Sequence, residues 1–98
     1  MAFKGAKGQI KFLRVNDLGG GYGPPSDVIH TEVTVALASN PNLAVGMELR
    51  DGDPNLPSRL AMLSILRHAF INKLAVGIAY DITEGKENGI LRRVELTQ

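Results

Sequence analysis

The chain of 98 residues contains no cysteine and no tryptophan. Without cysteine it cannot form a disulfide, use a thiolate nucleophile or hold a cysteine-ligated metal centre. Long hydrophobic runs are also missing, since no segment approaches the roughly 18 apolar residues of a membrane span. Residues 1–8 carry two lysines but no apolar segment behind them, which does not fit a secretory signal. Together these absences predict a cytoplasmic protein that does not cross a membrane.

The chain has almost no excess charge. Eleven Lys and Arg residues face ten Asp and Glu residues, which gives a net charge of +1. No overall field therefore attracts a polyanion, and a nucleic-acid role would need a local basic patch. The hydrophobic fraction of 44% is typical of a folded protein. The length predicts a single domain over residues 1–98.

No motif for catalysis, for a metal or for a cofactor stands out. The glycine-rich segment 16–27 ends in two prolines and leads into a strand, whereas phosphate-binding loops open a helix. The Asp-Gly-Asp run at 51–53 lacks the closing glutamate of a calcium loop, because Met62 stands there. His30 and Glu32 share one predicted strand face, but a metal site needs three or four ligands. We therefore expect no enzyme, no cofactor and no metal.

The order of the predicted elements is the most informative positive feature. The hydrophobic patterns predict, in order, strands at 9–15, 28–38 and 43–50, a helix at about 57–72, and strands at 75–82 and 90–96. The order β-β-β-α-β-β is that of the small OB-like barrel, in which one helix closes one end of a Greek-key sheet. We predict this mainly β fold, a five-stranded OB-like Greek-key barrel with one helix.

The segment 16–27 is predicted to be a shaped loop, because its glycines permit positive φ and its prolines fix an extended backbone. We expect a crossover that folds Tyr22 over the barrel or over a neighbour. Contact of Tyr22 with a ligand is the alternative, since aromatic residues on rigid loops are frequent contact points. In the strand that follows, His30 and Glu32 are expected on the exposed face.

The predicted helix has an apolar stripe that is expected to seal the barrel. Its members are Met62, Leu63, Leu66, Ala69 and Phe70. Leu60 and Ile71 lie outside the stripe among polar residues, which indicates that the outer side of the helix contacts something. The strand 75–82 also has one face of small residues that a neighbouring subunit could approach closely.

The helix line of residues 60–70, followed by 74–80, resembles the OB-fold B subunits of bacterial toxins and their uncharacterised bacterial relatives. Segments 12–17 and 21–27 also resemble a signature of small uncharacterised bacterial proteins. The toxin-subunit resemblance implies a homo-oligomer, with a pentameric ring as one form, and glycan binding in some members. It is architectural and transfers no glycan-binding residue to this chain.

Two functions follow as hypotheses. The first is a non-enzymatic, self-associating OB-type module that binds a protein or small ligand. The second is single-stranded nucleic-acid binding, in which a basic groove follows the phosphates and aromatic rings stack on bases. The candidate ligand-binding residues are Tyr22, Lys11, Arg14, Arg92 and Arg93, and Lys4 and Lys7 could add charge.

Overall fold

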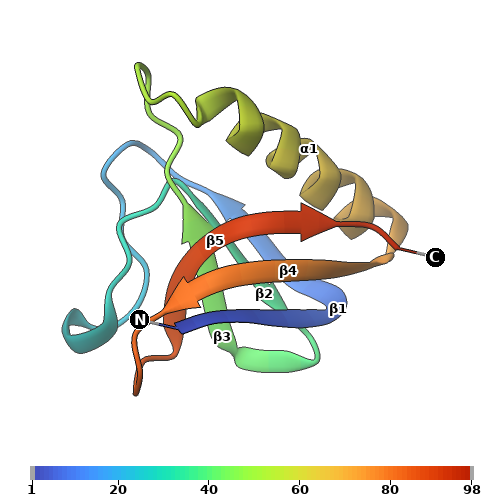
Figure 1. The fold of residues 1–98 in the computed structure, drawn as a ribbon, viewed down its shortest axis with the longest axis horizontal. Helices are drawn as coiled ribbons and strands as arrows, with labels where there is room; N and C mark the ends of the chain where they lie inside the picture. The colour runs from blue at the N-terminus through green and yellow to red at the C-terminus, as the bar shows by residue number, and fades with distance from the viewer. Residues whose placement is uncertain (1, 98) are drawn as a thin grey trace.

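The computed structural model describes residues 2–97. Its elements are β1 (Ala2–Val15), the short 3-10 helix η1 (Pro25–Asp27), β2 (Val33–Leu37), β3 (Asn40–Met47), α1 (Leu56–Asn72), β4 (Ala75–Ile82) and β5 (Asn88–Glu95). The strands close into a barrel in the order β1-β2-β3-β5-β4, and α1 lies across one end (Figure 1). The predicted element order, the five-stranded barrel and the single helix are confirmed.

β1 is long enough to serve two neighbours. Its residues 2–9 pair with β4 and its residues 10–15 pair with β2. A register shift between Ile10 and Phe12 separates the two halves, as a β-bulge does when a strand bends around a barrel. The predicted first strand began only at residue 9. The first half was not predicted because residues 2–8 consist of glycine, alanine and lysine apart from Phe3 and show no alternation of large apolar side chains.

The core lies between the strands and under α1. It contains Val33, Val35, Leu37, Leu43, Val45, Met47, Leu66, Ala69, Val76, Ile78, Tyr80, Ile82, Leu91 and Val94. Leu66 and Ala69 are the helix residues in this core, and both are fully buried. The expectation that Phe70 also seals the barrel is wrong, since its side chain is 44% exposed. Successive helix residues point about 100° apart, so a helix that buries Ala69 turns Phe70 outward.

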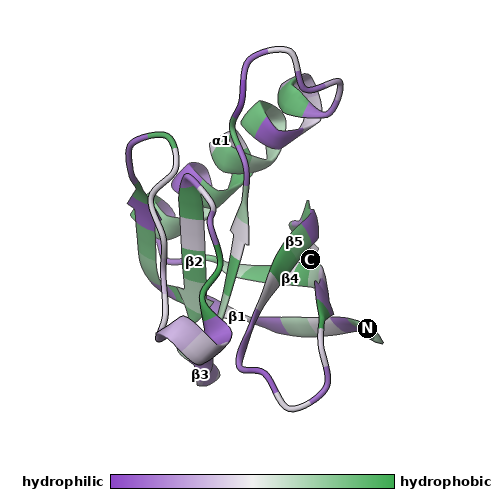
Figure 2. Cartoon of the chain, turned by 90° about the vertical axis from the view of Figure 1, so that its left-hand side faces the viewer, coloured by the Kyte–Doolittle hydropathy of each residue, from purple (hydrophilic) through white to green (hydrophobic). Residues whose placement is uncertain are grey.

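The connection between β1 and β2, residues 16–32, folds back over the outside of the barrel. We call it the covering loop. Thr34, Ala36 and Ala44 alternate with core residues and therefore point outward, yet all three are buried. At Gly46 the loop comes so close that an added Cβ would lie 2.1 Å from Thr31 Oγ1. The loop thus covers the outer face of β2 and β3 (Figure 2).

The predicted bounds of the second and third strands are wrong. β2 begins at Val33 rather than at residue 28, and residues 28–32 belong to the covering loop. Within that loop Ile29 forms a bridge with Tyr22 and is buried. Of residues 28–32, Ile29, Thr31 and Glu32 are buried, but outside the barrel core, and Val28 and His30 are exposed. β3 likewise covers 40–47 and not 43–50.

Candidate functional site

Glu32 fastens the covering loop to the barrel. Its Oε1 accepts hydrogen bonds from the Leu49 N–H at 2.8 Å and from Arg50 Nε at 3.3 Å. Its Oε2 accepts from the Gly19 N–H at 3.1 Å and from Arg50 Nη2 at 3.3 Å. One carboxylate therefore joins the start of the loop, its end and the segment after β3.

The surroundings of Glu32 favour its charged form. Burial raises the pKa of Glu32, but the hydrogen bonds from Arg50 and from the Gly19 and Leu49 N–H groups outweigh burial, and the pKa falls below its ordinary value of 4.5. The hydrogen bond with Glu32 also raises the pKa of Arg50. Because the pKa of Glu32 is lowered on folding, its carboxylate stabilises the fold above pH 4.5. That stabilisation is lost as the pH falls through the lowered value.

The expectation that Glu32 and His30 share an exposed face is wrong. Glu32 is 3% exposed, whereas His30 is exposed. The alternation of a strand does not hold here because residues 28–32 are not part of β2. Among residues 2–97 no group of three or more His, Asp or Glu side chains could hold a metal ion. The hydrogen bonds of Glu32 give it a structural role, because they hold the covering loop against the segment after β3.

Tyr22 packs on the outside of β1. The Arg14 guanidinium carbon lies 5.0 Å from the centre of the Tyr22 ring, and the Phe12 ring centre lies 5.8 Å from it. Arg14 Nη2 also donates to the Gly21 carbonyl at 3.4 Å. Tyr22 therefore folds over the barrel, as expected, where its half-buried ring lies against Arg14 and Phe12. Cation–π contact of this kind holds the loop against β1.

The other candidate residues do not join this pair in one patch. Lys11 is exposed at the β1 bulge, three residues before Arg14. Arg92 and Arg93 lie on β5, which β4 separates from β1 on one side and β2 and β3 on the other. Arg92 Nε donates to Asp81 Oδ2 at 2.7 Å, so part of its charge is neutralised. The structure brings Arg14 and Tyr22 together and places the β5 arginines elsewhere.

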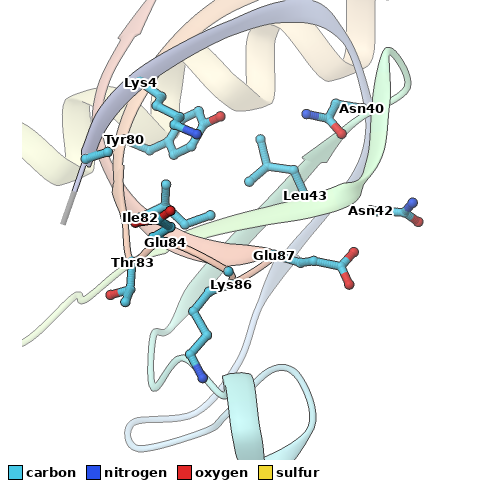
Figure 3. Close-up of a pocket in the computed structure, with 12 residues that line it drawn as sticks. Lys4, Asn40, Asn42, Leu43, Tyr80, Ile82, Thr83, Glu84, Lys86 and Glu87 are labelled. Carbon is cyan, nitrogen blue, oxygen red and sulfur yellow. The ribbon is translucent and has the colours of Figure 1, made fainter.

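A cavity of about 420 Å³ opens at the end of the barrel away from α1 (Figure 3). We call it the barrel-end cavity. Its floor is formed by Leu43, Tyr80 and Ile82, which all belong to the core. Its polar rim includes Lys4 on β1, Asn40 and Asn42 on β3, and Glu84, Lys86 and Glu87 on the β4–β5 turn. The cavity exists because β2 stops at Leu37, so that β1 and β3 are not joined at this end.

The barrel-end cavity has the composition of a ligand site. Its volume falls within the roughly 300–1,000 Å³ of small-molecule sites, which combine an apolar lining with a few polar groups. Figure 3 shows Lys4 and Tyr80 on one side of the cavity, with Asn40 and Leu43 on the other. Lys4 takes part in none of the four ion pairs formed among residues 2–97. The sequence did not predict this site, because Lys4 was considered only as a source of positive charge and Tyr80 only as a core residue.

Comparisons of the chain with protein-family models, with curated proteins and with solved structures find no match. The resemblance to toxin B subunits therefore stays a prediction, and only the geometry above bears on function. Within residues 2–97, α1 falls short of the length and apolarity that crossing a membrane requires.

Proposed function

We propose that the protein is a non-enzymatic binding module of the OB type that takes its ligand in the barrel-end cavity. The observation that carries this proposal is the combination of an apolar floor with the Lys4 ammonium group, which enters none of the ion pairs among residues 2–97, and the amide of Asn40 at the rim. Such a site suits a ligand with an apolar body and an anionic or hydrogen-bonding end. Tyr80 and Leu43 supply the apolar contact.

The face that OB barrels commonly use for binding is covered in this chain, which supports the barrel-end cavity as the binding site. OB barrels bind ligands on the face of strands 2 and 3 and with the loops after strands 1 and 4. In this chain the covering loop occupies that face. Asp27 Oδ2 accepts from the Glu87 N–H at 2.7 Å, and the Asp27 carbonyl accepts from Asn88 Nδ2 at 2.8 Å. Lys86 Nζ donates to the Ser26 carbonyl, so the two loops are tied together. The barrel-end cavity lies on the other side of the β4–β5 turn, where residues 83–87 line it.

Amide chemical shifts of ¹⁵N-labelled protein test the proposal. The probes are soluble aromatic carboxylates, from benzoate to indole-3-acetate, because these match an apolar floor beside a cation. We expect the largest shifts at Lys4, Leu43, Tyr80 and Thr83, and we expect Lys4→Ala to weaken them several-fold. Lys11→Ala removes the same charge outside the cavity and should leave them unchanged. Shifts confined to the covering loop, or an equal effect of both variants, would contradict the proposal.

The proposed module also associates with copies of itself. Large apolar side chains lie exposed on the outer side and C-terminal end of α1 and beside it, namely Leu60, Phe70, Ile71, Leu74 and Leu96. Exposed apolar groups that gather on one surface are typical of interaction sites. In sedimentation velocity we expect an oligomer that Ile71→Glu dissociates and that Ser58→Glu, on the first turn of α1, leaves intact. A monomer at every concentration would contradict self-association, and it would leave the proposal of a ligand in the barrel-end cavity unaffected.

A further inference from the structure

The first half of β1 is paired on one side only. Residues 2–9 pair with β4, whereas pairing with β2 begins at Ile10. On the side away from β4 two bonds reach this half of β1. Ser39 Oγ donates to the Lys7 carbonyl at 2.7 Å, and the Ala38 N–H donates to the Gln9 carbonyl at 2.8 Å. Both lie near its C-terminal end.

These two bonds fix the direction of the remaining backbone groups. In a strand the N–H and C=O of one residue point to the same side, and successive residues alternate. Since the Lys7 and Gln9 carbonyls point away from β4, those of Phe3 and Gly5 do so as well. Within residues 2–97 no strand pairs with that side. Phe3 to Gly5 therefore present a free strand edge, which we call the β1 edge.

The β1 edge borders the barrel-end cavity. Ala2 and Lys4 line the cavity from β1, and Asn40 and Leu43 of β3 line it from across the gap (Figure 3). An extended chain placed along the edge would pair with the backbone of Phe3 and Gly5. Its side chains would point alternately outward and into the cavity. The edge and the cavity thus form one site of the kind used in β-strand addition.

Charge selects the partner. β1 carries Lys4, Lys7, Lys11 and Arg14 and no acidic residue. Its lysines enter none of the ion pairs formed among residues 2–97. Lysines on an edge strand oppose pairing with a second copy, because like charges would then face each other. The same lysines attract glutamate or aspartate side chains on an incoming strand.

We propose that the β1 edge binds an extended acidic peptide as an added strand, with alternate side chains of the peptide in the barrel-end cavity. The inference rests on the proposed function, because it names the ligand class of the same cavity. Backbone pairing supplies affinity in such complexes, and the pocket for alternate side chains supplies specificity.

Peptide binding is tested by fluorescence polarisation with a labelled peptide of alternating glutamate and valine. A lysine–valine peptide is the charge control. Two further acidic peptides carry N-methyl groups on one or the other alternate set of amides. We expect the acidic peptide to bind, the basic one not to bind, and one N-methylated set to weaken binding at least tenfold while the other set is tolerated. Equal binding of both N-methylated peptides would leave only charge attraction and overturn the proposal.

Gly5 provides a matched pair of variants. Its N–H points to the free edge, so Gly5→Pro removes that donor and leaves the bonds to β4 in place. Gly5→Ala keeps the donor, and its added Cβ would lie 3.5 Å from the Ile78 carbonyl oxygen, an ordinary contact. We expect at least tenfold weaker binding by Gly5→Pro and wild-type binding by Gly5→Ala. Equal affinities would overturn the proposal, and if Gly5→Pro does not fold, the N-methylated peptides on wild-type protein decide.

The outcomes separate this inference from the proposed function. Cavity shifts with aromatic carboxylates, but no binding of the acidic peptide, would overturn the peptide proposal and leave the cavity as the ligand site. If neither the cavity shifts nor peptide binding is observed, both the proposed function and the peptide proposal are overturned. Protection of the Phe3 and Gly5 amides that rises with protein concentration would make a second copy the occupant of the edge, which also overturns the peptide proposal.

Discussion

Replacing Glu32 by alanine should lower the free energy of unfolding by roughly 2–3 kcal/mol, because hydrogen bonds to a charged group contribute about 1.5–3 kcal/mol. The Gly19 and Leu49 N–H groups both lose their acceptor in this variant. Urea unfolding measures the loss. Glu48→Ala is the matched control, since Glu48 also pairs with Arg50, at 2.9 Å, but its side chain is 41% exposed. The control should cost less than about 1 kcal/mol. An equal loss of unfolding free energy in Glu32→Ala and Glu48→Ala would show that Glu32 contributes no more than an exposed charge does.

The same carboxylate gives the protein a defined pH dependence. We compare the unfolding free energies of wild type and Glu32→Gln from pH 7 to pH 3. The pKa of Glu32 is lowered on folding, so the wild-type advantage should be complete above the ordinary pKa of 4.5 and should shrink as the pH falls through the lowered value. A wild-type advantage that grows towards acid would mean a raised pKa. That result would contradict the hydrogen bonding described here.

Gly46→Ala should lower the unfolding free energy by about 1–3 kcal/mol, the scale of overpacking a tight site. The added Cβ would lie 2.1 Å from Thr31 Oγ1 and 2.8 Å from the Val33 carbonyl oxygen, so the covering loop has to shift. Gly77→Ala is the matched control in β4. Its Cβ would meet the flexible Glu95 side chain at 3.1 Å, which can move aside. Thermal unfolding of both variants measures the difference, and a wild-type melting temperature for Gly46→Ala would contradict the close approach of the loop.

Local patterns predicted the elements that carry strong alternation or a long apolar stripe. β4 was predicted at its observed bounds, because Val76, Ile78 and Tyr80 alternate with small or polar residues. The predicted helix also agrees with α1 within one residue at its start. The first half of β1 has no such signal. Its strand conformation depends on pairing with β4, a segment far away in the sequence.

The candidate site was less predictable because its parts come from distant segments. Tyr22 and Arg14 were expected as separate candidates, and their contact was not foreseen. Glu32 was predicted to be exposed because its partner Arg50 lies 18 residues away and nothing in the local pattern links them. The barrel-end cavity depends on where β2 stops. That length is set by tertiary pairing and not by the residues that line the cavity.

Amide hydrogen exchange of the covering loop tests most directly the central claim that this loop closes the β2–β3 face and leaves the barrel end as the binding site. The amides to follow are those of Gly19, Tyr22, Ile29 and Leu49. Those of Gly19 and Leu49 donate hydrogen bonds to the Glu32 carboxylate, and those of Tyr22 and Ile29 donate to each other's carbonyl oxygens. We predict slow exchange, close to that of Val35 in the barrel, and its loss at Gly19 and Leu49 in Glu32→Ala. Exchange at the rate of an open chain, while Val35 stays protected, would contradict the claim and return the β2–β3 face to the surfaces free for a ligand.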